Sequence, residues 1–258
     1  MQSDRQAVEF FHLQLARVLC AGPDRDAYAI KGGCNLRFFF DSVRYSEDLD
    51  LDVSARVPVH ALKDKMARVL SGPALALPLK TRDIAVGQVS APKQTETTQR
   101  WKVELVAGGE HLHTKVEFSR RPSDEVAIAE AVGRGVLEEH RVMPLIAPHY
   151  PLSAAMRQKV EALTMRSEVQ ARDVFDLAVL FARAGDASQA LGPVSALLPK
   201  AVERAMEIPF AHYKAQVVSW LRPDQVDLYG TQEAWDGMQL QVVDVMERAR
   251  TLDVEREP

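Results

Sequence analysis

The chain has 258 residues, 47% of them hydrophobic, and a formal net charge of −4 at pH 7. This length and apolar content suffice for a substantial core in two lobes. Residues 1–143 hold 20 basic and 20 acidic residues and residues 144–258 hold 12 and 16, which excludes a strongly basic half. A polynucleotide would therefore have to bind through a local basic patch.

Membrane and secretory classes are also disfavoured. No apolar run approaches the roughly 20 residues of a membrane span, and charged residues interrupt the N-terminus where a signal peptide needs an apolar core. Cys20 and Cys34 offer neither a disulfide framework nor metal-ligand spacing, as expected in a reducing compartment. We therefore predict a cytoplasmic protein with no membrane partner.

The first predicted element is a helix that begins with the capping-box pattern Ser3-Asp4-Arg5-Gln6 and stops at Ala21-Gly22-Pro23. Residues 27–30 fit a short buried strand, and the apolar run 34–40 can open a helix after the turn Lys31-Gly32-Gly33. A strand, glycine turn and helix point backbone N–H groups at an anion. We interpret the turn as a phosphate cradle; the alternative is a turn that only needs a left-handed residue.

The next element carries an acidic stripe. Asp48, Asp50 and Asp52 alternate with apolar residues, which predicts a half-buried strand with three carboxylates on one face. Like charges on one face are unfavourable unless a cation compensates them. Residues two apart on a strand lie about 6.5–7 Å apart, so two carboxylates can hold divalent ions about 3.5–4 Å apart. The alternative is a solvated acidic edge.

Residues 60–70 are predicted to form a helix, residues 79–86, 100–106 and 112–118 to form strands of a mixed sheet, and residues 124–137 to form another helix. Two groups of basic residues are candidate polynucleotide contacts, although solvated faces explain them better. They are Lys63, Lys65 and Arg68 on the first helix, and Lys80 and Arg82 on the first of these strands.

Three prolines between residues 144 and 151 mark a boundary. We predict an N-terminal helix and core at residues 1–143, a linker at 144–152 and a helical domain at 153–258. In that domain, Lys159, Arg166 and Asp173 are spaced by seven residues, which puts them on one side of a continuous helix. They fit either a functional surface or an exposed ladder of ion pairs.

Two groups of residues, far apart in the sequence, form recognisable motifs. The first reads Lys31-Gly32-Gly33-x-x-Leu36, followed by Arg44-x-Ser46-x-Asp48-Leu49-Asp50-Leu51. The second reads Lys159-Val160-x-Ala162-Leu163-x-x-Arg166, followed by Arg172-Asp173-Val174-Phe175-Asp176-Leu177. In this order they resemble the motifs of the AbiEii/AbiGii nucleotidyltransferase toxin family, within the DNA polymerase β-like superfamily.

The resemblance implies an α+β fold, with a minimal polymerase β-like nucleotidyltransferase core containing a mixed sheet, and a helical C-terminal domain. It implies that Asp48 and Asp50 are catalytic and hold Mg²⁺, with two ions expected. It also implies catalytic roles for Lys159 and Asp173. The implied nucleotide-binding residues are Lys31, Gly32, Gly33, Arg44, Ser46, Lys159 and Arg172.

Relatives in the superfamily place a third carboxylate on a neighbouring strand, and Glu117 is the best candidate here. Glu117 could act as general base or as a further metal ligand; the alternative is a cross-strand pair with a basic residue. Many relatives also carry Ser or Thr after the glycines. This chain has Cys34 there, so the corresponding hydroxyl contact to a triphosphate is not expected.

Together these residues predict an enzyme that moves a nucleoside monophosphate from an NTP to an acceptor hydroxyl and releases pyrophosphate. The resemblance implies the toxin of a toxin–antitoxin or phage-defence pair, with tRNA as acceptor and a cognate antitoxin as partner. Two alternatives stay open. One is a nucleotidyltransferase that modifies a small molecule such as an antibiotic, and the other is a non-catalytic module that binds nucleotide or antitoxin.

Overall fold

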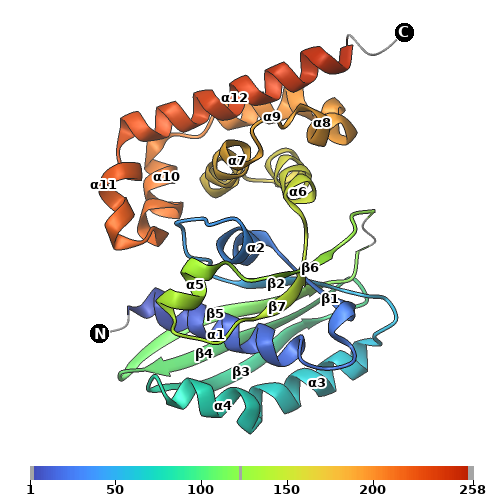
Figure 1. The fold of residues 1–258 in the computed structure, drawn as a ribbon, viewed down its shortest axis with the longest axis vertical. Helices are drawn as coiled ribbons and strands as arrows, with labels where there is room; N and C mark the ends of the chain where they lie inside the picture. Colours follow the sequence, from blue (N-terminus) through green and yellow to red (C-terminus); the bar gives the residue numbers. More distant parts are fainter. Residues whose placement is uncertain (1–2, 122–123, 255–258) are drawn as a thin grey trace. The chain divides into compact units, whose positions relative to one another are not determined.

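The computed structural model describes residues 3–121 and 124–254 and divides the chain into two compact units. The first unit contains Met1–Asp41 and Tyr45–Tyr150, and the second contains Ser42–Arg44 and Pro151–Pro258. A seven-stranded mixed sheet lies in the first unit, and the second is helical (Figure 1). The predicted α+β class is therefore confirmed.

The sheet has the strand order β3-β4-β5-β2-β1-β7-β6. The pairs β2–β5 and β1–β7 are parallel, and the other neighbours are antiparallel. The acidic strand β2 is therefore central. The strands are β1 (Tyr28–Lys31), β2 (Leu49–Val53), β3 (Ile84–Gln94), β4 (Thr98–Ala107), β5 (Glu110–Ser119), β6 (Ile128–Ala131) and β7 (Ile146–His149).

One face of the sheet is apolar and packs against helices. Leu49, Leu51 and Val53 of β2 are buried while the intervening aspartates are half-buried, which confirms the predicted alternation. The capping box is also confirmed, because the Ser3 side chain and the Gln6 side chain each accept the other's backbone N–H. The helices of this unit are α1 (Asp4–Leu19), α2 (Gly32–Phe39), α3 (Val59–Ser71), α4 (Pro73–Lys80) and α5 (Arg134–Glu139).

Two sequence predictions about this unit need correction. The strand predicted at residues 79–86 begins only at Ile84, as β3, because residues 73–80 form α4, in which Pro73 occupies the first turn and Leu75 and Leu79 bury one face. Lys80 and Arg82 therefore do not lie on a strand. The predicted helix at 124–137 instead contains β6 and the start of α5, because pairing of β6 with β7 overrides the helical preference of its alanines and glutamate.

The boundary between the units also differs from the predicted linker. Strand β7 lies inside residues 144–152 and pairs with both β1 and β6. Pro148 belongs to this strand, so the proline cluster does not form a loop throughout. The chain passes from the first unit to the second between Tyr150 and Pro151.

In the second unit, Lys159 and Asp173 do not share one continuous helix, because this part of the chain forms two helices, α6 (Leu152–Met165) and α7 (Ala171–Ala184). Lys159 and Asp173 therefore come from different helices. Trp235 is fully buried and stacks on Tyr213 at a ring-centroid distance of 4.4 Å, so it is a packing residue. The remaining helices are α8 (Ser188–Leu191), α9 (Leu198–Met206), α10 (Phe210–Gln216), α11 (Val226–Tyr229) and α12 (Gln232–Val254).

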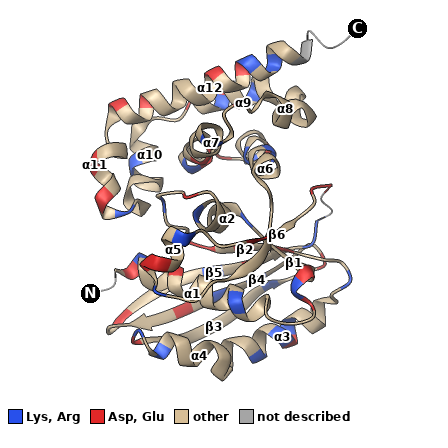
Figure 2. Cartoon of the chain, viewed as in Figure 1, with Lys and Arg blue, Asp and Glu red and all other residues tan. Residues whose placement is uncertain are grey.

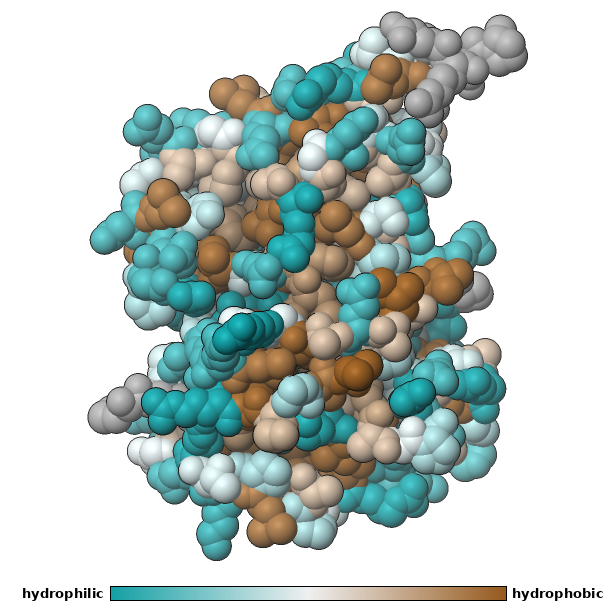
Figure 3. Space-filling model, viewed as in Figure 1, coloured by the Kyte–Doolittle hydropathy of each residue, from teal (hydrophilic) through white to brown (hydrophobic). Residues whose placement is uncertain are grey.

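The surface agrees with the composition. Basic and acidic residues are interspersed over both units (Figure 2), as expected from the balanced charge. The face seen in Figure 3 carries both kinds of residue, with apolar residues gathered toward its middle and hydrophilic residues toward its edges. No helix within residues 3–121 and 124–254 is both long and apolar enough to cross a membrane.

Candidate active site

The turn between β1 and α2 places backbone against the acidic strand. Gly32 has φ +64°, a conformation that side-chain-bearing residues rarely adopt. A Cβ atom at Gly32 would lie 2.6 Å from Asp50 Oδ2, so the missing side chain lets the carboxylate approach the turn. The first N–H groups of a helix lack intrahelical acceptors, and Lys31, the N-cap residue of α2, makes no cap hydrogen bond with its side chain. This geometry suits an anion held by backbone donors.

Asp48 lies immediately before β2 and pairs with β5. Its carboxylate accepts hydrogen bonds from Lys115, at 3.2 Å from the backbone N–H and 2.7 Å from Nζ. The side chain of Lys115 is 40% exposed and that of Asp48 19% exposed. An ammonium group therefore already compensates part of the acidic stripe. Because the pair is open to solvent, another cation could replace the ammonium at low cost.

Asp52 has a different role from that of its neighbours. Its Oδ1 lies 2.5 Å from Lys31 Nζ, and its Oδ2 accepts a hydrogen bond of 2.6 Å from the Tyr150 hydroxyl. Both carboxylate oxygens are thus engaged within the first unit. Asp52 fastens the lysine of the glycine turn to the central strand.

A buried network beneath the site holds the backbone that carries Asp48. The Thr114 hydroxyl donates to the Glu47 carbonyl at 2.7 Å, so its one proton is used there. His12 Nε2 lies 2.7 Å from the hydroxyl oxygen of Thr114 and must therefore donate to it. His12 Nδ1 is then an acceptor and lies 3.6 Å from the Cys34 sulfur. Burial lowers the pKa of His12 to about 3, so the ring stays neutral.

Two further groups bind the Asp48 carbonyl directly. The Cys34 thiol approaches it at 3.3 Å, and the Ser46 hydroxyl donates to it at 2.8 Å. Burial raises the pKa of Cys34 well above its usual value, so it remains a thiol. Cys34 therefore faces the core and supports Asp48. Nucleotide binding by Ser46 stays a prediction.

Glu117 is the register partner of Asp50 across β2 and β5. It also forms a cross-strand ion pair with Arg100, whose Nε lies 2.6 Å from Glu117 Oε2. This is the contact that the alternative interpretation predicted. The role of Glu117 as general base or third metal ligand stays a prediction, and Arg100 would compete for its carboxylate.

Asp48, just before β2, and Asp50, on β2, are the candidate ligands of a divalent ion. Carboxylate oxygens are the ligands that Mg²⁺ prefers, and Asp50 rests in the space that a Cβ at Gly32 would fill. A second acidic cluster, formed by Glu9, Glu139 and His140, has its ligand atoms within 4.8 Å of one another. Arg37 bonds both of its carboxylates, at 2.7 Å and 2.6 Å, so a guanidinium already neutralises that cluster. We therefore place the candidate metal site at Asp48 and Asp50.

The second unit contains a buried ionic cluster around Lys159. Its Nζ lies 3.0 Å from Asp173 Oδ1 and 2.6 Å from Asp176 Oδ2. Both aspartate side chains are fully buried, and the lysine side chain is 10% exposed. Burial alone would lower the pKa of Lys159, but Asp176 and Asp173 outweigh it and raise the pKa. The exposed ladder considered from the sequence is thus wrong, because these groups are inside the unit.

Arginines complete this cluster. Arg44 binds Asp176 through Nη2 at 3.0 Å, and Arg166 Nε lies 2.9 Å from Asp173 Oδ2. Burial raises the pKa of Asp176, but Arg44 and Lys159 outweigh burial, so the pKa is lowered. Sequence reasoning gave Asp176 no role. Its position three residues after Asp173, on the same face of a helix, is the signal that could have found it.

Two further predicted nucleotide-binding residues, Arg44 and Arg172, belong to this unit. Arg44 ties the Ser42–Arg44 segment to the helical unit rather than to the sheet. Arg172 lies in the first turn of α7 and is half-buried. The predicted contacts of Arg44, Lys159 and Arg172 with a nucleotide, and the catalytic role of Asp173, stay predictions.

The fold is that of nucleotidyltransferases. A protein from H. pylori assigned as a nucleotidyltransferase has a similar crystal structure, with a TM-score of 0.63 and 17% sequence identity over 98% of each chain. The protein JHP933 from Helicobacter pylori is also similar, with a TM-score of 0.54 and 18% identity over 98% of each chain. At these identities the likeness establishes the fold alone. No curated protein sequence matches the chain significantly.

The family follows from the sequence. The model of the AbiEii nucleotidyl transferase toxins of type IV toxin–antitoxin systems matches residues 14–245. The chain therefore belongs to this family, which confirms the predicted resemblance and the nucleotidyltransferase class. Membership also implies a nucleotide substrate and an antitoxin partner.

Proposed function

We propose that this protein is a Mg²⁺-dependent nucleotidyltransferase that moves a nucleoside monophosphate from an NTP to a hydroxyl group of tRNA. It would act in the cytoplasm as the toxin of its pair, restrained by a cognate antitoxin. The observation that carries the proposal is the close approach of Asp50 to the Gly32 turn. A carboxylate that binds metal and backbone donors that bind phosphate are thereby held side by side.

Asp48 and Asp50 would hold Mg²⁺, with two ions as the proposed number. When bound, Mg²⁺ supplies positive charge that stabilises both the attacking and the leaving oxygens. The first-turn N–H groups of α2 would bind phosphate oxygens at Gly32 and Gly33. Thr114 and Ser46 keep the backbone around Asp48 in place through the carbonyl contacts described above.

In the transfer step, the acceptor oxygen forms a bond to the α-phosphorus of the NTP. The bond from that phosphorus to the bridging oxygen breaks, and pyrophosphate leaves with the electron pair. The acceptor hydroxyl loses its proton, for which Glu117 is the proposed base. Because Glu117 is bound to Arg100, this role requires the carboxylate to exchange one partner for another.

The test uses purified protein with Mg²⁺, each of the four labelled NTPs, and total tRNA. We expect label on tRNA from at least one NTP. Asp48→Asn should lower the rate by at least about a thousandfold with an unchanged fold, because charge stabilisation by metal ions contributes several kcal/mol. Asp52→Asn is the matched control on the same strand. It should lower the rate far less, since Asp52 binds Lys31 and Tyr150.

The other candidate functions give different results. Label on an aminoglycoside but not on tRNA would indicate an antibiotic-modifying enzyme. Nucleotide binding without transfer to any acceptor would indicate a binding module. Equal rates for wild type and Asp48→Asn would refute the metal assignment.

A further inference from the structure

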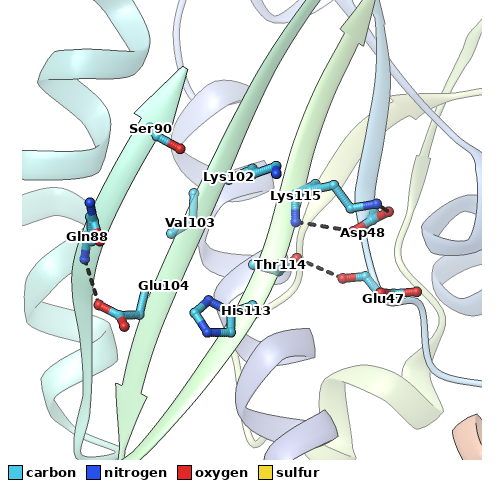
Figure 4. Close-up of a pocket in the computed structure, with 10 residues that line it drawn as sticks. All are labelled: Glu47, Asp48, Gln88, Ser90, Lys102, Val103, Glu104, His113, Thr114 and Lys115. Carbon is cyan, nitrogen blue, oxygen red and sulfur yellow. Dashed lines mark hydrogen bonds and ion pairs between the residues drawn. The ribbon is translucent and has the colours of Figure 1, made fainter. Parts of the chain in front are cut away.

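A pocket of about 410 Å³ opens on the polar side of the sheet beside Asp48 (Figure 4). Its walls come from β3, β4, β5 and the residues just before β2. This volume is typical of sites for small molecules and cofactors. In the strand order, β1 and the Gly32 turn lie on one flank of β2, and the strands of the pocket lie on the other. A molecule in the pocket would therefore reach Asp48 from the flank opposite the turn.

One acidic residue of the pocket, Glu104, forms hydrogen bonds within the protein. The register of β3 against β4 shifts between Val86 and Val89, which frees the Gln88 N–H from the ladder. Glu104 Oε2 accepts this N–H at 3.0 Å, and its Oε1 lies 2.9 Å from His111 Nδ1. Gly87 makes room, since a Cβ there would lie 2.5 Å from Glu104 Oε2. These hydrogen bonds, to Gln88 first, lower the pKa of Glu104.

The pocket also contains groups that can bind an anion. Its lining includes Lys102 and Lys115 beside the carboxylates of Glu47, Asp48 and Glu104. Glu104 is bound to β3, and Asp48 is the candidate metal ligand. A metal on Asp48 would release Lys115 from its present pair. Both ammonium groups would then be available to a phosphate.

Two exposed side chains supply more specific contacts. Lys102 and His113 project from β4 and β5 at the pocket, and both are exposed. A lysine binds a phosphate as a point charge, and a histidine ring can stack on an unpaired base. The attacking and leaving groups of phosphoryl transfer lie roughly in line. An acceptor must therefore enter from the side opposite the pyrophosphate, which is the side of this pocket.

We propose that this pocket holds the terminal nucleotide of a polynucleotide acceptor, with Lys102 on the phosphate and His113 against the base. The inference rests on the proposed function, because it assigns the acceptor side of the same reaction. It also defines which flank of β2 each substrate uses. The NTP lies at the Gly32 turn, and the acceptor lies on β3, β4 and β5.

The experiment measures binding and transfer separately with a short single-stranded RNA that has a free 3′ hydroxyl. Lys102→Ala should weaken RNA binding by roughly tenfold and reduce the slope of log affinity against log salt by about 0.7, as expected for the loss of one phosphate contact. His113→Ala should weaken binding by a similar factor with no change in that slope. The melting-temperature rise given by NTP with Mg²⁺ should be unchanged in both variants.

Lys214→Ala is the matched control, because Lys214 is an exposed lysine on α10 and is not among the candidate polynucleotide contacts. RNA affinity of Lys102→Ala equal to that of Lys214→Ala would overturn the proposal, as would competition for the pocket by an aminoglycoside. The two hypotheses fail separately. If Lys102→Ala loses RNA affinity but wild type transfers no nucleotide, the subsite stands and the proposed function fails. If transfer occurs and Lys102→Ala has normal RNA affinity and rate, only the subsite fails.

Discussion

The two ionic regions of the molecule use the same residue types in opposite ways. On the central strand, the pairs Asp48–Lys115 and Asp52–Lys31 are half-buried, with lysine side chains 40% and 27% exposed. In the helical unit, the carboxylates around Lys159 are fully buried. A partly exposed pair contributes little and exchanges easily. A buried pair cannot lose one member without leaving an uncompensated charge.

The formal charges of the two regions also differ in sign. Asp48, Asp50 and Asp52 face two lysines, which leaves one negative charge on the strand. In the helical unit, one lysine and two arginines face two aspartates, which leaves one positive charge. The strand is therefore suited to gain a cation, and the helical cluster to gain an anion. The metal role of the strand and the nucleotide role of the helical cluster stay predictions.

The largest expected effect tests the energetic side of this comparison. Lys159→Ala should lower the free energy of unfolding by about 3–5 kcal/mol, because it removes the ammonium group that binds both buried carboxylates and leaves each with one arginine partner. Lys115→Ala, which removes the matched lysine that pairs with Asp48, should lower the free energy of unfolding by about 1 kcal/mol or less. Urea denaturation of the full chain measures both. Similar losses for the two variants would show that burial does not separate the regions.

Much of the strand region could be predicted from the sequence, because its signals are local. The alternation of aspartates with Leu49 and Leu51 fixes which side chains share a face, and the Gly32 turn requires a backbone that glycine tolerates. The supporting contacts are not local. His12 reaches Thr114 across 102 positions of sequence, and no spacing rule connects them.

The helical region shows the opposite balance. The seven-residue spacing of Lys159 and Asp173 is a helical signal, yet the chain breaks between α6 and α7, and the contact is made across two helices. Arg44 enters this cluster from the N-terminal half of the sequence. Similarly, β6 depends on its partner β7, which sequence periodicity does not report. Long-range pairing decided each of these features.

Acidification should lower the stability of the two regions by different amounts, and this difference should be smaller than that between the two lysine variants. His12 is neutral in the folded protein, with its pKa lowered by burial from 6.5 to about 3, whereas the unfolded chain binds a proton below pH 6.5. Stability of the first unit therefore falls as pH drops from 6.5 toward 3, with a loss of about 2 kcal/mol by pH 5. The pKa of Asp176 is lowered in the folded protein, so this group stabilises the fold fully above its usual pKa of 3.8. Its contribution to the free energy of unfolding is therefore still present at pH 5 and is lost only below pH 3.8.

Hydrogen exchange resolved by peptide, corrected for intrinsic rates, measures this difference in the full chain. Between pH 7 and pH 5, α1 should lose protection while α7 keeps it. His12→Asn should remove most of the pH dependence of α1, whatever its effect on absolute stability. Equal loss of protection in both helices at pH 5 would contradict the assignment of His12 as the acid-sensitive group.

The smallest expected effect concerns a side chain that is absent. The helical cluster depends on groups that are present, whereas the Gly32 turn depends on the space beside Asp50. Gly108 provides a close control, because its φ is also positive, at +57°, and nothing lies within 4 Å of where its Cβ would be.

Both alanine variants should lose about 1 kcal/mol of stability from the left-handed backbone. Only Gly32→Ala should displace the Asp50 carboxylate, so only it should weaken binding of NTP with Mg²⁺, by roughly tenfold, or about 1.4 kcal/mol. Isothermal titration of both variants measures the affinities. If Gly32→Ala binds NTP as tightly as Gly108→Ala, the turn has a structural role alone, and the phosphate contacts must be sought elsewhere in the chain.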